Sequence, residues 1–213
     1  MDQLDEICEQ IRSDFNRKTT RRDTALAQAR ELTRHSSLAI RAIHREEQPE
    51  AEAELAAARA LAQTLRDSLS ADPDLYFAGY TQDAVKEYCE ATLTVAIIRG
   101  DPLPTPQDLG AESAAYVNGM TETLGELRRR CLDLLRPGYS AEVERLLSCM
   151  DDIFTQLVTM DYPDAITDGL RRRTDLARGI IERTRADITL SFRQNELESA
   201  ISRLSQQLSA PAE

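Results

Sequence analysis

Hydrophobic and polar positions follow a helical period along most of the chain. Between residues 26 and 43, apolar side chains recur three or four positions apart, as they do on one face of an α-helix. The same spacing returns further on, and we expect long helices over about residues 2–44, 49–69, 73–98, 115–135, 140–160 and 163–204. The basic segment 18–22 is a candidate break in the first of them. The pattern predicts an all-α bundle of about six or seven long helices.

Prolines and glycines mark the boundaries of these helices. Pro49, Pro73 and Pro163 stand near helix starts, where proline is favoured. The segment RGDPLPTPQDLG, residues 99–110, holds three prolines and two glycines, so we expect a loop without helix there. No repeat of fixed period appears. We therefore expect one domain over residues 1–213, with a tail from about residue 205 to 213 that frays.

Composition agrees with a helical chain and excludes several classes of protein. Glycine and proline number only 8 each, and aromatic residues make up 5%. The four cysteines lie far apart, without the spacing of zinc or disulfide frameworks. No window is apolar enough for a membrane helix, and the N-terminus is acidic, unlike a signal peptide. We expect a soluble, cytoplasmic protein that does not bind a membrane.

The net charge is -11, yet the basic residues are clustered. All but two of the 26 are arginines, whose planar fork binds phosphate through two hydrogen bonds. Either these clusters pair with the surplus acids on solvated helix faces, or they bind nucleic-acid phosphates. The candidate nucleic-acid-binding residues are Arg17, Lys18, Arg21, Arg22, Arg129, Arg171, Arg172 and Arg173.

Four glutamates on two expected helices form a candidate metal site. Glu87 and Glu90 lie three residues apart and enter an almost wholly apolar run, where a carboxylate requires a compensating cation. Glu122 and Glu126 lie four apart on the next long helix. If the two helices pack side by side, the four carboxylates meet in a hard-ligand site suited to Mg²⁺ or Mn²⁺. In the alternative interpretation, Glu126 pairs with Arg130 on a solvated surface.

Two further features favour the carboxylates over a nucleophilic centre. Gly119 and Gly125 flank Glu122 inside a helix, at a cost of about 1 kcal/mol each relative to alanine. A helix tolerates this cost where another backbone or a ligand must come close. By contrast, His35 and His44 have no serine, cysteine or aspartate at catalytic spacing.

The central segment AYVNGMTETLGELRRRCLDLL resembles the signature of the translin family. That signature is Tyr-x-x-Gly, five residues, then Gly-Glu-Leu-x-Arg, and it is met here by Tyr116, Gly119, Gly125, Glu126, Leu127 and Arg129. The segments RRDTALAQARELTRHSSLAIRAIHR and DGLRRRTDLARGIIERTRADI are similar to the family's first and last long helices. The resemblance implies the translin-like helical fold and a hollow homo-octamer with inward-facing sites.

Within the family, the chain is most similar to the branch of translin-associated factor X. The pattern Glu-Tyr-x-Glu of that branch is met by Glu87, Tyr88 and Glu90, and an acid, Glu122, stands four residues before Glu126. The branch is an Mg²⁺-dependent endoribonuclease of single-stranded RNA. The resemblance therefore implies that Glu87, Glu90, Glu122 and Glu126 are the catalytic residues and the ligands of Mg²⁺ or Mn²⁺. Glu122 stands where that branch carries aspartate.

Three functional interpretations remain open. The first is a metal-dependent endoribonuclease of single-stranded RNA inside a homo-oligomer, with the arginine clusters on flanking phosphates. The second is a non-catalytic binder of single-stranded RNA or DNA with the same fold, and the third is a helical scaffold. In translin proper, a basic segment at the start of the third helix is implicated in RNA binding, and the matching residues here, 75–85, contain no lysine or arginine. This difference favours the nuclease branch.

Overall fold

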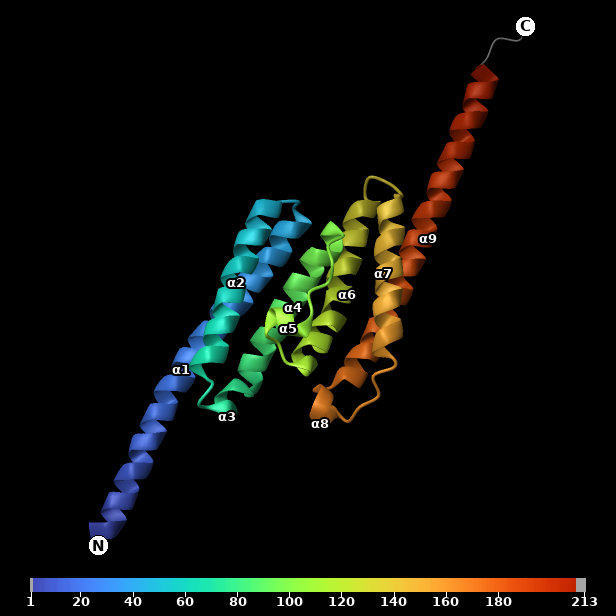
Figure 1. Ribbon diagram of the computed structural model, residues 1–213. Coiled ribbons are helices and arrows are strands. Elements are labelled where there is room, and N and C mark those ends of the chain that lie inside the picture. Colours follow the sequence, from blue (N-terminus) through green and yellow to red (C-terminus); the bar gives the residue numbers. More distant parts are fainter. Residues whose placement is uncertain (1, 210–213) are drawn as a thin grey trace.

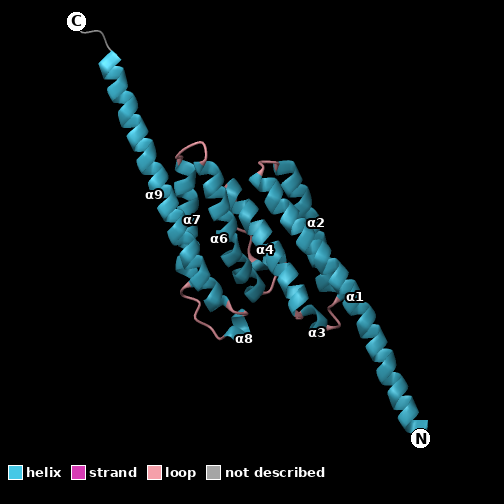
Figure 2. Cartoon of the chain, turned by 180° about the vertical axis from the view of Figure 1, so that it is seen from behind, coloured by secondary structure: helices cyan, strands magenta, loops and turns pink. Residues whose placement is uncertain are grey.

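The computed structural model describes residues 2–209, and every regular element in that range is a helix (Figures 1 and 2). Six helices are long: α1 (Asp2–His44), α2 (Gln48–Ser68), α4 (Gly79–Arg99), α6 (Ser113–Leu135), α7 (Ala141–Leu157) and α9 (Leu170–Ser209). Three are single turns: α3 (Pro73–Tyr76), α5 (Pro106–Leu109) and α8 (Asp164–Thr167). The predicted all-α class and the number of long helices are confirmed.

Helices α4 and α6 form the middle of the bundle. Helices α1 and α2 pack beside α4, and α7 and α9 pack beside α6 (Figure 1). One apolar core lies on the α1–α2 side around Leu32, Leu65 and Leu93. A second lies on the α7–α9 side around Leu127 and Met150. Because α4 has neighbours on several sides, it is apolar nearly all round, as its sequence indicates.

The first part of α1 and the last part of α9 project from the bundle in opposite directions (Figures 1 and 2). We call residues 3–15 the N-terminal arm and residues 190–208 the C-terminal arm. Both arms carry large exposed apolar side chains, namely Leu4, Ile7, Ile11 and Phe15 on the first and Leu190, Leu197, Ile201, Leu204 and Leu208 on the second. No described helix is both long and apolar enough to cross a lipid bilayer.

The first helix is unbroken, so the expected break at residues 18–22 is wrong. That segment holds no proline or glycine. The hydroxyl of Thr20 donates a hydrogen bond to the carbonyl of Asn16 at 3.1 Å, which keeps the threonine compatible with the helix. The ammonium of Lys18 pairs with Asp74 at 3.1 Å, which ties this turn to the bundle.

Two expected helices are each split after one turn. The segment 73–98 divides into α3 and α4 because Ala78 is extended, with ψ of 144°, and the Thr81 hydroxyl donates to the Leu75 carbonyl at 2.9 Å. The segment 163–204 divides into α8 and α9 at Asp168 and Gly169, which have φ of 51° and 79°. Aspartate and glycine tolerate this left-handed conformation better than other residues.

Two segments that were expected to lack regular helix are helical in the structure. Residues 106–109 of the proline-rich segment form α5, because Pro106 takes the first helical position and Thr105 and Asp108 cap each other reciprocally. At the other end of the chain, α9 continues to Ser209, so residues 205–209 are helical where fraying was expected. The first helix-breaking residue there is Pro211, and residues 210–213 lie outside the described part of the chain.

Candidate functional site

A single glycine sets how closely α4 and α6 approach. A Cβ atom on Gly119 would lie 2.7 Å from the carbonyl oxygen of Lys86 and 2.9 Å from the nitrogen of Glu90, both in the α4 backbone. Any side chain at residue 119 would therefore push the two helices apart. A Cβ atom on Gly125 would meet nothing within 4 Å. The expected close approach of another backbone is confirmed at Gly119, whereas at Gly125 no backbone among the described residues of this chain approaches.

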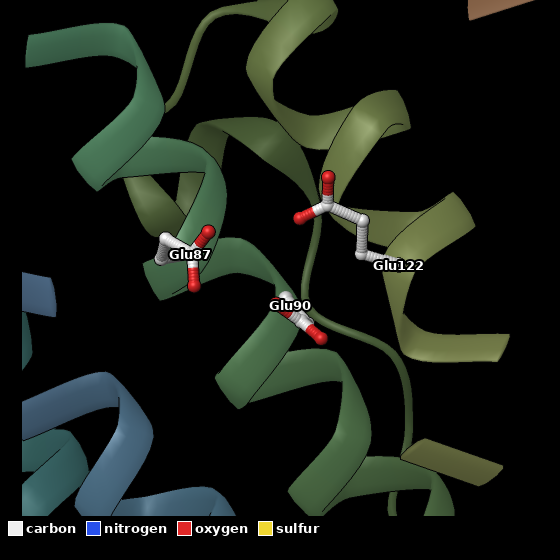
Figure 3. Close-up of side chains that lie close together, drawn as sticks. All are labelled: Glu87, Glu90 and Glu122. Carbon is white, nitrogen blue, oxygen red and sulfur yellow. The ribbon is translucent and has the colours of Figure 1, made fainter. Parts of the chain in front are cut away.

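The close helix pair brings three of the predicted carboxylates together. One oxygen each from Glu87, Glu90 and Glu122 lies within 4.8 Å of the other two. Figure 3 shows the first two side chains on α4 and the third on α6, across the space between the helices. Glu90 is 9% exposed, and the other two are half-buried. We call these three residues the carboxylate cluster.

Of the three carboxylates, Glu90 is the one whose negative charge is least offset by neighbouring groups. Burial raises its pKa from 4.5 to about 8, and the negative charges of Glu87 and Glu122 add to this effect. Among the groups that the structure describes, none donates a hydrogen bond to its carboxylate. Near neutral pH, Glu90 therefore holds a proton despite the opposing charge of Lys86, unless a further cation binds.

Two basic side chains reach into the cluster. The ammonium of Lys86 lies 2.8 Å from Oε1 of Glu122 and 3.3 Å from Oε1 of Glu87. Burial disfavours its charged form, but the hydrogen bond to Glu122 and the charges of both glutamates outweigh burial and raise the Lys86 pKa. From α9, the guanidinium of Arg173 donates to the same Glu122 oxygen at 2.5 Å. Glu122 is thus neutralised within the chain itself.

The fourth predicted carboxylate, Glu126, lies outside this group of three. Its Oε2 accepts a hydrogen bond from Nε2 of His44 at 2.6 Å, across the interface between α1 and α6. That bond, with the charges of His44 and Arg129, outweighs burial and lowers the pKa of Glu126. The alternative partner, Arg130, pairs instead with Glu46 at 2.8 Å.

Sequence reasoning missed Lys86 and His44. Lys86 is one of two lysines in the chain and directly precedes Glu87. The sequence therefore did indicate a cation next to the carboxylates. His44 follows Ile40 by one turn on the buried face of α1, and its side chain is only 3% exposed. A histidine at such a position is buried together with a polar partner, but its partner lies 82 residues away and no local spacing reveals it.

The N-terminal basic residues pair with acids far from the carboxylate cluster. Arg17 and Arg21 both contact Asp72, which is buried at the start of α3. The hydrogen bonds from Arg21 and Arg17 outweigh the burial of Asp72 and hold its pKa below the usual range. Lys18 pairs with Asp74, as described above, and Arg22 lies 3.5 Å from its neighbour Asp23. Four of the predicted phosphate-binding residues therefore have acidic partners on or beside α1 and α3.

The later basic residues divide between the site and the surface. Arg173 contacts the carboxylate cluster, and Arg129 lies 3.6 Å from Glu126. Arg171 pairs with Asp161 at 2.8 Å on an exposed surface. Arg172 is exposed and pairs with no acid among the described residues.

A surface groove of about 330 Å³ opens onto the cluster between α4, α6 and α9. Glu90, Glu122 and Arg173 line its polar part, and Leu176 and Ile180 line its apolar part. The cluster therefore combines hard oxygen donors, two cations and access from the surface. Such a set is suited to a divalent cation and to an anionic substrate.

Comparisons with known proteins find relatives over most of the chain. No protein-family model matches the chain. An uncharacterized protein of Methanocaldococcus jannaschii, MJ0175, is 33% identical over 180 residues, which cover 84% of this chain and 79% of that protein. AfC3PO in a complex with duplex RNA is 33% identical, with a TM-score of 0.81 over 87% of this chain and 96% of AfC3PO.

Two further solved structures share the fold. A crystal structure of AfC3PO matches with 32% identity and a TM-score of 0.81, covering 87% of this chain and 97% of that one. Apo-NeC3PO is 18% identical and matches with a TM-score of 0.79, covering 86% and 96% of the two chains. Together with the central motif around Tyr116, Gly119 and Glu126, these relationships identify the protein as a member of the translin family.

Proposed function

We propose that this chain is a divalent-metal-dependent endoribonuclease that hydrolyses single-stranded RNA. One observation carries the proposal: Glu87, Glu90 and Glu122 converge within 4.8 Å, and the buried Glu90 has no hydrogen-bond donor among the described residues. A likeness to AfC3PO, which has been solved with duplex RNA, supports RNA as the ligand. The preference for single strands and the cleavage reaction come from the resemblance to the nuclease branch.

The cluster residues fit Mg²⁺ or Mn²⁺. Their donors are hard carboxylate oxygens, without a thiol or imidazole among the three. Glu87, Glu90 and Glu122 would hold the ion, and Glu126 remains the proposed fourth ligand, kept ionised by His44. A bound divalent cation supplies activation of water and stabilisation of the charge that develops on phosphate during hydrolysis.

The chain's own residues supply the remaining requirements. Arg173 lines the groove and Lys86 contacts Glu122 in its wall, so two positive charges would lie beside a phosphodiester bound there. Leu176 and Ile180 form an apolar wall on one side of the groove. Gly119 holds α4 and α6 close enough for the carboxylates of both helices to share a ligand.

The proposal includes assembly into a homo-oligomer of eight subunits. Exposed apolar side chains on both arms support assembly, because large apolar surfaces on a monomer mark interaction sites. The number eight comes from the family resemblance. We further propose that residues 1–213 act as one domain and that single-stranded DNA is a second ligand.

A non-catalytic RNA-binding protein is the second candidate. It is favoured by the ion pairs of Glu122, which Lys86 and Arg173 satisfy without metal. In that case, the cluster would be a buried charge network that stabilises the α4–α6–α9 contact.

Incubation of purified protein with end-labelled single-stranded and duplex RNA, in Mg²⁺ or in EDTA, separates the two candidates. The nuclease proposal predicts cleavage of the single strand in Mg²⁺ and none in EDTA. Binding without cleavage under both conditions would support the second candidate and contradict the first.

A further inference from the structure

Lys86 and Arg173 share one atom of the carboxylate cluster. Both donate to Oε1 of Glu122, at 2.8 Å and 2.5 Å, although one comes from α4 and the other from α9. Lys86 has a further contact with Glu87 at 3.3 Å. The positive charges of Lys86 and Arg173 formally balance the negative charges of Glu87 and Glu122.

This arrangement conflicts with metal binding through the same carboxylate. A divalent cation on Glu122 would add two positive charges beside an ammonium and a guanidinium that already occupy one of its oxygens. Like charges at contact distance repel strongly, especially where the side chains are screened from water. The side chains of Lys86 and Arg173 are 11% and 29% exposed, so solvent screens Lys86 little. Metal and basic side chains therefore compete for Glu122.

We propose that Lys86 and Arg173 are exchangeable cations: they neutralise Glu122 in the metal-free protein and pass to a substrate phosphate when a divalent cation binds Glu122. This inference rests on the proposed nuclease function. A phosphate oxygen accepts hydrogen bonds from ammonium and guanidinium groups, and a phosphodiester in the groove would lie beside Glu122, whose Oε1 both cations contact. Arg173 lines this groove together with Glu90 and Glu122.

The direction in which Mn²⁺ affinity changes when a basic side chain is removed distinguishes competition for Glu122 from structural support of the site. If Lys86 competes with metal, Lys86→Met should bind Mn²⁺ more tightly, by about tenfold in Kd for each 1.4 kcal/mol of competition removed. Arg173→Met should act in the same direction. Arg172→Met is the matched control, because Arg172 is the adjacent arginine and has no acidic partner among the described residues.

Calorimetric titration of each folded variant with Mn²⁺, without RNA, measures this effect. Tighter binding by Lys86→Met and Arg173→Met, with Arg172→Met unchanged, supports the exchange. Unchanged or weaker binding by the first two variants would overturn it while leaving the nuclease proposal standing. If the wild type and all three variants fail to bind Mn²⁺, both the exchange and the metal-dependent function are contradicted.

The transfer of the Arg173 guanidinium to a substrate phosphate is tested separately, through the salt dependence of RNA binding. Affinity for a single-stranded RNA is measured against salt concentration, once in EDTA and once in Ca²⁺ in place of Mg²⁺. Arg173→Met should flatten the log-log slope by about 0.7 unit in Ca²⁺ and leave it unchanged in EDTA, because in the metal-free wild type Glu122 holds the guanidinium away from RNA. Arg173→Lys, which keeps the charge, should restore the slope. An equal change in both conditions, or no change in either, would contradict the transfer to phosphate.

Discussion

At the scale of single residues, Glu90 should make the stability of the metal-free protein depend on pH. Its folded pKa of about 8 lies above the ordinary 4.5, so the folded state binds more protons than the unfolded state between these values. The free energy of unfolding should therefore fall as pH rises from about 4.5 to about 8, and this contribution should be constant above that. Glu90→Gln removes the titrating group and keeps its size.

Thermal denaturation in EDTA across this pH range, for wild type and Glu90→Gln, checks the prediction. The wild type should lose stability relative to the variant as pH rises. Parallel curves for the two proteins would show that Glu90 titrates normally, and burial would then not be the dominant influence on its pKa.

Glu126 gives a second prediction at this scale. Glu126→Gln keeps the shape and a hydrogen-bonding group but removes the charge that His44 stabilises, so RNA cleavage in Mg²⁺ should fall by about ten- to hundredfold. Arg130→Gln is the control, because Arg130 pairs with Glu46 instead. Normal cleavage by Glu126→Gln would remove Glu126 from the proposed ligands, leaving the other three.

The residue scale also shows what the sequence could and could not predict. The three-residue spacing of Glu87 and Glu90 was enough to place both on one face of a helix, and the structure brings that face beside Glu122. The cations that meet them were less accessible to sequence reasoning. Arg173 comes from a helix 51 residues further along, and the partner of Glu126 lies 82 residues earlier. Such pairings depend on how helices pack, which local periodicity does not determine.

At the scale of helices, the α4–α6 contact should depend on Gly119 and not on Gly125. Gly119→Ala would place a Cβ 2.7 Å from a carbonyl oxygen and 2.9 Å from a nitrogen of the α4 backbone, and overpacking of this kind costs about 1–3 kcal/mol. Gly125→Ala meets nothing within 4 Å, so helix propensity should stabilise it by about 1 kcal/mol. Denaturant unfolding of the pair should give free-energy changes of opposite sign. Equal changes in the free energy of unfolding would mean that the close helix approach at Gly119 does not affect stability.

Helix existence was predictable at this scale, whereas the break at Ala78 was not. The long segments have strong apolar periodicity, which local sequence expresses directly. The division at Ala78 depends instead on a hydrogen bond from Thr81 to the Leu75 carbonyl, and the division at Asp168 depends on a left-handed residue. An Asp-Gly pair indicates such a turn, so the second break was readable in residues 168–169.

At the scale of the whole molecule, the arms should hold subunits together. The C-terminal arm exposes Leu197, Ile201 and Leu204, a spacing of four and three residues that forms a seam for a neighbouring helix. Replacing these three with serine should shift the protein from the proposed octamer to smaller species in light scattering. Val158→Ser is the control, because Val158 is exposed but lies outside both arms. A wild type that scatters as a 23.9 kDa monomer at micromolar concentration would contradict the assembly.

We propose that the carboxylate cluster formed by α4 and α6 makes this family member a metal-dependent ribonuclease. Its most direct test compares wild type with Glu122→Gln in Mg²⁺, measuring cleavage and binding of the same labelled single-stranded RNA. Under this proposal, the wild type should cleave the RNA rapidly, cleavage by the variant should be reduced at least about a hundredfold, and both proteins should retain RNA binding. Equal cleavage by the two proteins, or no cleavage by the wild type while it binds RNA, would contradict it.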